Sequence, residues 1–333
     1  MIASVQFRNC RVLRDATLPL GRFTLIVGAN GSGKSTALQA LQWRHTDFQR
    51  IVTVGIQTPE AEVVEVVVRW GPPHEDVMTT MQWYSRRGHT REHKSVQGHV
   101  LRKGDKQILT PKLSEIRLYS LDADAIASPV QLEPNIVLSK NGARLAGVLD
   151  RLRDLVPERF EALNDEFGRW LPEFDRILFD TPQAGHRSFL LRTRQGHHAI
   201  PASDLSQGTL LALAILTLAY LPTPPPLICL EEPDRGMHPR LLRDVQDALY
   251  RLSYPENFGE KRDPVQVVAT THSPYFLDLF KDHPEEIVIA HRVGQAAYFE
   301  RLVDRPEIND ILGDAPLGEV WYSGILGGVP AES

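Results

Sequence analysis

One glycine-rich segment constrains this chain more than any other. Gly28-Ala29-Asn30-Gly31-Ser32-Gly33-Lys34-Ser35 satisfies the pattern G-x-x-x-x-G-K-[ST]. The apolar run 23–27 precedes it, and residues 36–45 follow with apolar positions at helical spacing. The order strand, loop and helix predicts a phosphate-binding loop, in which backbone N–H groups and a helix N-terminus surround a phosphate group. A glycine-rich turn without a ligand is the alternative, and the flanking strand and helix argue against it.

Within this loop the chemistry is divided among a few residue types. Lys34 supplies a positive charge to the β- and γ-phosphate oxygens, and the hydroxyl of Ser35 supplies a ligand to Mg²⁺. Glycine tolerates the positive φ angles that turn N–H groups inward. The residues expected to bind the nucleotide here are Asn30, Gly31, Ser32, Gly33, Lys34, Ser35 and Thr36.

Composition limits the class of protein. With 333 residues, of which 42% are hydrophobic, the chain accommodates two domains or a single α/β core with an inserted lobe. A net charge of -5 excludes a surface that is basic throughout, so any nucleic-acid contact requires a local patch. We find neither the layout of a signal peptide at the N-terminus nor an apolar run long enough to span a bilayer. Cys10 and Cys229 lie in apolar surroundings, as expected of buried thiols in a reducing cytoplasm.

The first part of the chain is rich in β-strand signals. Alternation at Val5 and Phe7 predicts a strand before the one that enters the loop. The β-branched run 62–70 predicts another, and residues 78–84 are expected to be its partner across the turn 71–73. A further strand is expected at 116–121, followed by an irregular connection at 122–140.

Residues 86–106 form the most basic stretch of the sequence. Clustered Lys and Arg side chains on one hairpin would displace counterions from a DNA backbone, whereas a solvated loop is an equally good interpretation. Three histidines lie within the stretch at His89, His93 and His99. They have no Cys or carboxylate in register, which argues against a metal site.

Helical spacing appears in the middle of the chain. Apolar residues at 145–155 and 160–170 predict two antiparallel helices, the second beginning at Pro157. Residues 177–180 and 189–193 are expected to be strands that return the chain to the core.

Polar motifs follow this insert. Ser206 in the segment Leu205-Ser206-Gln207-Gly208-Thr209 stands at the start of an apolar helix, as an ordinary N-cap would. The buried strand 227–230 ends in Glu231 and Glu232, where an α/β sheet places its ligand chemistry. One carboxylate could hold the hydration shell of Mg²⁺ and the other could orient water. The strand 265–269 leads to His272, a candidate contact for a γ-phosphate.

Four features follow one another along the chain: the phosphate loop, the segment 205–209, the acidic pair and the strand-end histidine. Their order resembles that of the ABC-type ATPase superfamily and, within it, of the RecF, OLD and SMC branch. The resemblance covers nearly the whole chain, and Glu231-Glu232-Pro233 followed by His238-Pro239 is similar to a segment of OLD-type and stand-alone AAA ATPases. It implies an α/β P-loop NTPase fold, an ABC-type ATPase head with a mixed β-sheet core and an inserted helical lobe. We expect a β-rich part at 1–135, the lobe at 136–205 and the rest of the core at 206–333.

The resemblance also implies roles for residues outside the loop. Two copies would pair head to tail on ATP, with Ser206 and Gly208 of one subunit touching the γ-phosphate bound at Lys34 of the other. Glu232 would be the catalytic base or water-orienting residue. Glu231 would act on the Mg²⁺ side and His272 would sense the γ-phosphate.

The sequence departs from the family pattern in several places. The signature reads LSQGT rather than LSGGQ, Glu231 stands where many relatives have Asp, and Gln57 and Gln82 are both candidates for the Q-loop residue. The length after His272 is too short for the TOPRIM nuclease of OLD-type proteins, and the insert is too short for an SMC coiled coil. The apolar tail 320–328 resembles tails that act with a separately encoded partner; folding back onto its own core is the alternative.

These features favour a cytoplasmic, ATP-hydrolysing head that dimerises on ATP, contacts DNA and controls a partner effector such as a nuclease, in DNA repair or antiviral defence. A nucleotide-binding subunit of a membrane transporter is an alternative, against which the non-transporter signature weighs. A nucleotide switch that holds a dimer together without hydrolysis is another.

Overall fold

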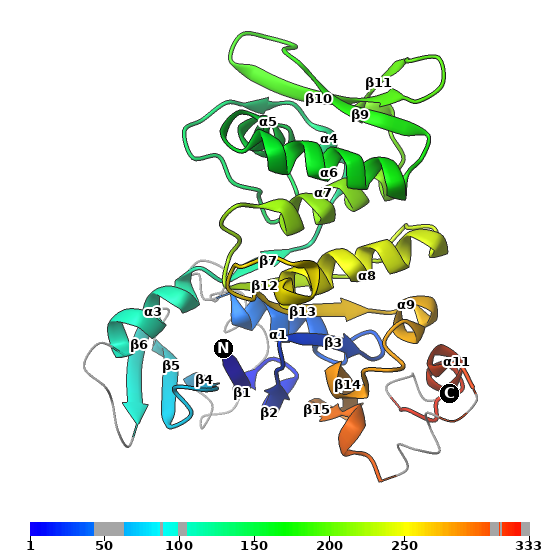
Figure 1. The fold of residues 1–333 in the computed structure, drawn as a ribbon. Coiled ribbons are helices and arrows are strands. Elements are labelled where there is room, and N and C mark those ends of the chain that lie inside the picture. The colour runs from blue at the N-terminus through cyan, green and yellow to red at the C-terminus, as the bar shows by residue number, and fades with distance from the viewer. Residues whose placement is uncertain (43–62, 87–88, 99–104, 307–312, 314, 328–333) are drawn as a thin grey trace. The chain divides into compact units, whose positions relative to one another are not determined.

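The structure is a computed structural model of the 333-residue chain. It describes residues 1–42, 63–86, 89–98, 105–306, 313 and 315–327. Two compact units emerge from the contacts within this part (Figure 1). Unit 1 comprises Met1–Leu118, Pro225–Leu230 and Pro264–Ser333, and unit 2 comprises Tyr119–Pro224 and Glu231–Asp263. Each unit is described separately below.

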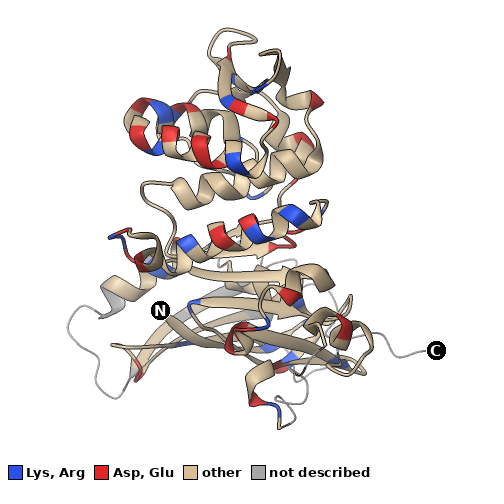
Figure 2. Ribbon diagram, turned by 45° about the vertical axis from the view of Figure 1, so that its right-hand side comes forward, with Lys and Arg blue, Asp and Glu red and all other residues tan. Residues whose placement is uncertain are grey.

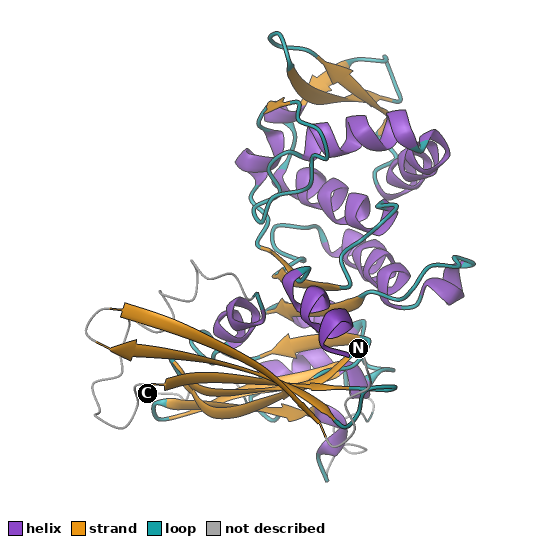
Figure 3. Ribbon diagram, turned by 90° about the vertical axis from the view of Figure 1, so that its left-hand side faces the viewer, coloured by secondary structure: helices purple, strands orange, loops and turns teal. Residues whose placement is uncertain are grey.

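Unit 1 contains a five-stranded antiparallel sheet in the order β2-β1-β4-β5-β6. Its strands are β1 (Ile2–Cys10), β2 (Leu13–Pro19), β4 (Val63–Trp70), β5 (Val77–Arg86) and β6 (His89–Gly98). The alternation at Val5 and Phe7 is confirmed, since both are buried whereas Arg8 of the same strand is exposed. Figure 3 shows these long strands in orange. The basic stretch enters this sheet, because β6 pairs with β5 as a hairpin.

A second, six-stranded sheet in the order β15-β14-β3-β13-β12-β7 completes the strands of unit 1. Its strands are β3 (Phe23–Val27), β7 (Arg117–Tyr119), β12 (Leu227–Glu231), β13 (Gln266–Thr271), β14 (Ile287–Val293) and β15 (Ala296–Arg301). β3 lies between β13 and β14 and is parallel to both. All five residues of β3 are buried, as expected for a parallel strand covered on both faces.

The α-helices in the described part of unit 1 are α1 (Lys34–Leu41), α3 (Asp105–Ser114), α9 (Pro274–Asp278) and α11 (Leu317–Tyr322). One hydrophobic cluster joins α1, through Leu38, to Val66 of the five-stranded sheet and Ile26 of β3. The core of this unit therefore lies directly behind the segment that follows β3. Cys10 and Cys229 are buried in the same cluster, as the sequence predicts.

Unit 2 contains five helices. They are α4 (Ala123–Ala127), α5 (Leu145–Leu155), α6 (Pro157–Trp170), α7 (Gln207–Tyr220) and α8 (Pro239–Ser253). The expected pair α5 and α6 is confirmed, with Leu149 and Leu163 fully buried on their apolar faces. α7 is buried along residues 208–220, because it is apolar on every side and is enclosed by α4, α6 and α8.

A small antiparallel sheet belongs to unit 2, and here one expectation was wrong. Its strands are β8 (Val130–Gln131), β9 (Phe174–Asp180), β10 (His186–Thr193) and β11 (Ala199–Pro201). β9 and β10 do not return the chain to the core sheet, because they pair with each other as a hairpin and β10 continues the pairing to β11 and β8. Gly185, at φ 75°, occupies the hairpin turn. The irregular connection also contains α4 and β8, which the sequence did not indicate.

None of the helices within the described ranges combines the length and the apolar character needed to cross a membrane.

Candidate nucleotide site

The phosphate-binding loop predicted from the sequence connects β3 to α1. Gly33 is the N-cap of α1 at φ 94°, and a Cβ there would lie 2.9 Å from Cδ2 of Leu13. At Gly28 a Cβ would lie 2.4 Å from the carbonyl oxygen of Ala290. Both positions favour glycine, because each has a positive φ that other residues rarely adopt and each has neighbouring atoms close by. The loop is therefore packed tightly against β2 and β14.

Lys34 and Ser32 are buried polar residues of the loop. The Lys34 side chain is buried, and its Nζ donates hydrogen bonds to the carbonyl oxygens of Gly28 at 2.6 Å and Ala29 at 2.9 Å. The ammonium group is thus folded back over the loop. Ser32 Oγ is buried and has no hydrogen-bond partner within the described part of the chain. Such an orphaned polar atom beside an ammonium group fits an anionic, hydrogen-bonding ligand.

Exposure distinguishes the other residues of the loop. Thr36 is buried in the first turn of α1, whereas Asn30, Gly31 and Ser35 are exposed. The Ser35 hydroxyl is accessible to an ion, and the eight-residue helix directs its positive end toward the loop. These residues fit a nucleotide with Mg²⁺, in the positions that the motif predicts.

His272 lies at the same edge of the sheet as the loop. β13 runs parallel to β3 with Thr271 opposite Val27, so both strands end together. Ser273 then caps α9 by accepting a hydrogen bond from the N–H of Phe276 at 3.2 Å, which fixes the turn that carries His272. The structure therefore brings His272 and the phosphate loop to one edge of unit 1.

Arg292, near the end of β14, contacts the loop. Its Nη1 donates to the carbonyl oxygen of Gly31 at 3.4 Å, and its Nε donates to the carbonyl oxygen of Gly294 at 3.0 Å. No motif contains Arg292. The only signal in the sequence is a cation placed just after the apolar run 287–290, at the end of a strand.

The signature-like segment, residues 205–209, belongs to unit 2 and contains the start of α7. Ser206 is the N-cap, and its Oγ accepts a hydrogen bond from the N–H of Thr209 at 3.2 Å. Ser206 is exposed, whereas Gly208 is buried. A Cβ at Gly208 would lie 3.0 Å from the carbonyl oxygen of Gly236, so the segment packs closely against the turn that precedes α8. Ser206 therefore caps the start of α7, while Gly208 packs the same helix end against the turn before α8.

Glu231 and Glu232 also belong to unit 2. Glu231 is the last residue of β12, and Glu232 has φ 45°, an uncommon conformation for a residue with a side chain. The N–H of Arg235 donates to the carbonyl oxygen of Glu232 at 3.0 Å, which closes the turn after the strand. Arg235 in turn donates from Nη2 to the carbonyl oxygen of Leu121 at 2.8 Å. Both carboxylates are partly exposed.

The expected site residues thus fall into two groups. Unit 1 holds the loop residues 30–36 and His272, and unit 2 holds Ser206, Gly208, Glu231 and Glu232. Their roles as ligands, base and sensor stay predictions.

The two Q-loop candidates have different outcomes. Gln82 lies on the outer face of the five-stranded sheet, where its Nε2 donates to Oε2 of Glu65 at 2.6 Å. Arg8 donates to the other oxygen of the same carboxylate at 2.6 Å. These three side chains line a polar hollow of about 360 Å³ on that face. Gln57 lies outside the described residues.

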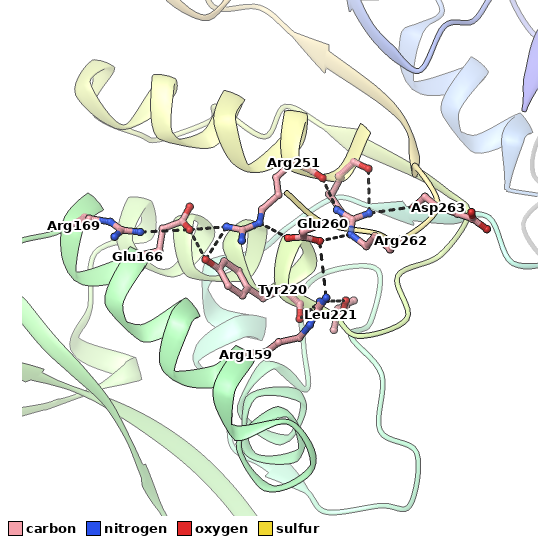
Figure 4. A network of polar contacts seen from close by, with 10 residues as sticks. Arg159, Glu166, Arg169, Tyr220, Leu221, Arg251, Glu260, Arg262 and Asp263 are labelled. Atoms are coloured by element: carbon pink, nitrogen blue, oxygen red, sulfur yellow. Dashed lines mark hydrogen bonds and ion pairs between the residues drawn. The ribbon is translucent and has the colours of Figure 1, made fainter. Parts of the chain in front are cut away.

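A polar network joins the helices of unit 2 (Figure 4). Arg251 on α8 donates from Nη1 to Glu166 on α6 and to the hydroxyl of Tyr220 on α7, both at 2.8 Å. Tyr220 also hydrogen-bonds to Glu166, and burial raises the pKa of its hydroxyl well above the usual range. Figure 2 shows both signs of charge along these helices. Glu260 bridges Arg251 and Arg262, so each charge of the network has an opposite partner.

This chain is similar in sequence to two described families and to a nuclease. The profile of a family described as "AAA domain, putative AbiEii toxin, Type IV TA system" matches residues 105–278, and that of a second family described as "AAA domain" matches residues 4–53. An OLD nuclease from Thermus scotoductus (strain ATCC 700910 / SA-01) is 21% identical over 365 aligned positions, which cover 87% of this chain and 64% of the nuclease. The chain therefore spans less than two thirds of the length of that relative.

Two solved structures share the fold. An SMC head bound to the C-terminal winged-helix domain of ScpA superposes with a TM-score of 0.63 at 17% identity, covering 90% of this chain and 96% of that one. The SMC head domain from Thermotoga maritima superposes with a TM-score of 0.50 at 17% identity, covering 90% and 98%. The expected fold, an α/β P-loop NTPase core of the ABC-type head, is confirmed.

Proposed function

The chain belongs to the AAA domain family and is an ATPase head of the RecF, OLD and SMC branch, and from this premise we propose that it binds and hydrolyses ATP, dimerises on ATP and controls a partner effector that acts on DNA. The observation that carries the proposal is the phosphate loop. Lys34 is folded over the loop, Ser32 Oγ is buried without a partner among the described residues, and the exposed Ser35 hydroxyl follows. This combination suits a triphosphate with its metal ion.

The residues divide the work of hydrolysis as follows. The loop N–H groups and Lys34 hold the phosphates, and Ser35 with Glu231 would hold Mg²⁺. When bound, Mg²⁺ neutralises charge on the phosphate oxygens. Glu232 orients water and accepts its proton, and His272 donates a hydrogen bond at the γ-phosphate position. The strained backbone at Glu232 supports this assignment, because such strain is retained where a side chain must be held in place.

Dimerisation on ATP is the second element of the proposal. Ser206 and the N-terminus of α7 are exposed, and a 14-residue helix presents its positive end there. An exposed helix N-terminus with a serine cap is suited to an anion that another molecule carries. In the proposed dimer this anion is the γ-phosphate of ATP bound at Lys34 of the second copy. The region 136–205 then serves as a lobe inserted into the head.

A partner effector is the third element of the proposal. An OLD nuclease matches over 87% of this chain, and the aligned part is 64% of that nuclease. We infer that the head acts with a nuclease or another effector on DNA, in repair or in antiviral defence. The hairpin of β5 and β6, which contains much of the basic stretch, is the proposed DNA contact. A transporter subunit is disfavoured, because the signature differs from the transporter form.

The variant Glu232→Gln tests the proposal. It removes the proton acceptor but keeps the size of the side chain, so we expect ATP to stay bound and the dimer to persist during size-exclusion chromatography with MgATP. Ser203→Ala serves as a matched control at another exposed polar residue of unit 2. Turnover at the wild-type rate in Glu232→Gln would remove Glu232 from the mechanism. A dimer in both proteins without any phosphate release would instead favour a non-hydrolysing switch.

A further inference from the structure

Arg292 places a positive charge against the phosphate loop, and none of the motifs accounts for it. Its guanidinium is exposed and makes two hydrogen bonds, both to backbone carbonyl oxygens, those of Gly31 and Gly294. No described carboxylate forms an ion pair with it. Arg305, from the same unit, is instead bound to Glu300 at 2.8 Å. The charge of Arg292 is therefore not neutralised within the described part of the chain.

The sheet fixes the position of Arg292. β14 is parallel to β3 with Ile289 opposite Val27, so the continuation of β14 runs beside the continuation of β3, which is the loop. The neighbouring His291 is buried, its Nε2 lies 3.0 Å from Oε2 of Glu300, and its ring stacks on that of Tyr298 with the ring centres 4.7 Å apart. A side chain held by a strand end is placed more reproducibly than one on a free loop.

The guanidinium also lies very near the loop backbone. A Cβ at Gly31 would lie 3.0 Å from Arg292 Nη1, and Gly31 itself is at φ 77°. The hydrogen bond to the Gly31 carbonyl is long, at 3.4 Å. Exchange of this long bond to a neutral carbonyl for a bond to an anionic phosphate oxygen is favourable, because both partners are then charged and the planar guanidinium can bind two phosphate oxygens at once.

We propose that Arg292 is a further nucleotide-binding residue, which leaves the Gly31 carbonyl and binds the phosphates of ATP on the exposed side of the loop. The inference rests on the proposed function, since it requires a nucleotide at Lys34. A triphosphate carries one more negative charge than a diphosphate, so Arg292 favours ATP over ADP. The preference for ATP over ADP thus depends on a residue of β14, the strand whose Ala290 lies next to Gly28.

Three variants of the full chain test this role. Arg292→Gln keeps an N–H donor for the Gly31 carbonyl but removes the charge, and Arg292→Lys keeps the charge. Arg69→Gln removes one charge from an exposed arginine on the five-stranded sheet and serves as the control. Binding of MgATP and MgADP is measured by calorimetry for each protein, at low and at moderate salt.

We expect Arg292→Gln to weaken MgATP about tenfold and MgADP about threefold. Arg292→Lys should stay within about threefold of wild type for both nucleotides, with Arg69→Gln unchanged. The salt dependence of ATP binding should also decrease in Arg292→Gln, because one charged contact is lost.

The inference and the proposed function fail in different ways. If wild type binds MgATP and Arg292→Gln binds it equally well, or loses ATP and ADP affinity by the same factor, the inference is wrong and the proposed function stands. If wild type binds neither nucleotide, the proposed function is wrong and the inference falls with it. If Arg292→Gln loses more affinity for MgATP than for MgADP, and Arg292→Lys does not, the result supports both the inference and the proposed function.

Discussion

Arg251 donates a hydrogen bond to the hydroxyl of Tyr220 at 2.8 Å while its guanidinium carbon lies 4.4 Å from the centre of the Tyr220 ring. This contact joins the C-terminal ends of α7 and α8 (Figure 4). At the other end of the same helices, Gly208 packs against Gly236. Helices α7 and α8 are thus in contact at both ends, and the contact at their N-terminal ends joins the signature-like segment to the turn after the acidic pair.

Loss of Arg251 should be costly for the stability of unit 2. Arg251→Ala removes the cation that Glu166 and Glu260 share, together with its contact with the Tyr220 ring. Glu260 keeps Arg262 at 2.7 Å, whereas Glu166 keeps only Arg169 at 3.7 Å, so we expect about 2 kcal/mol less free energy of unfolding. Arg176→Ala removes an exposed ion pair with Glu161 and should cost less than about 0.5 kcal/mol. Urea denaturation of the two variants measures the difference. Equal losses would mean that the network contributes no more than a surface ion pair.

The same network predicts a pH dependence. Burial raises the pKa of Glu260, but hydrogen bonds from Arg251 and Arg262 outweigh it and hold the pKa below the ordinary 4.5. The carboxylate therefore contributes stability above pH 4.5, and this contribution is lost as the pH falls through the pKa of the folded state. Burial shifts Asp244 and Asp247 the other way, raising the pKa of each.

Comparison of wild type with Glu260→Gln isolates this effect, since the two aspartates are common to both proteins. In urea denaturation, the stability advantage of wild type should be constant at neutral pH and should shrink as the pH falls below 4.5 and through the lower pKa of the folded state. Glu161→Gln, in an exposed ion pair, is the matched control. An advantage that stays constant over this range would contradict the shift assigned to Glu260.

Gly208 should not tolerate a methyl group. In Gly208→Ala the new Cβ would lie 3.0 Å from the carbonyl oxygen of Gly236, so the helix start must move away from the turn. We expect a loss of about 1–3 kcal/mol in unfolding free energy. Gly71→Ala is the control, because its nearest neighbour would lie at 3.6 Å. A neutral Gly208→Ala would show that the contact between segment and turn is loose.

The cysteines should be inert in the folded protein. Both are buried, and burial raises the pKa of the Cys10 thiol to about 12, so little of the reactive thiolate forms at neutral pH. A thiol reagent should modify neither residue until the protein is unfolded. Rapid modification of Cys10 under native conditions would contradict the packing of β1.

Local patterns predicted several elements of both units well. The apolar run before Gly28, the alternation at Val5 and Phe7, and the helical spacing at 145–155 each report burial along one segment, which is a local property. Ser206 as an N-cap followed from the residue type and position alone.

Long-range pairing could not be predicted in the same way. The residue pattern predicted strands at β9 and β10, but nothing in that pattern shows which strands they pair with. In the structure they pair with each other, and β10 also pairs with β11 and β8 rather than with the core sheet. Arg292 reaches Gly31 across 261 positions of sequence, and Arg251 meets Glu166 across 85. Such contacts depend on the packing of whole elements, which a motif does not encode.

Phosphate release from MgATP by the purified chain, compared with Lys34→Ala, tests the central claim most directly. Lys34 is the buried ammonium group over the loop, so its removal should abolish turnover while wild type releases phosphate continuously. Glu232→Gln, assayed beside it, should also be inactive but retain bound ATP. Wild type that releases no more phosphate than Lys34→Ala, with or without added DNA, would contradict the claim that this loop serves an ATPase.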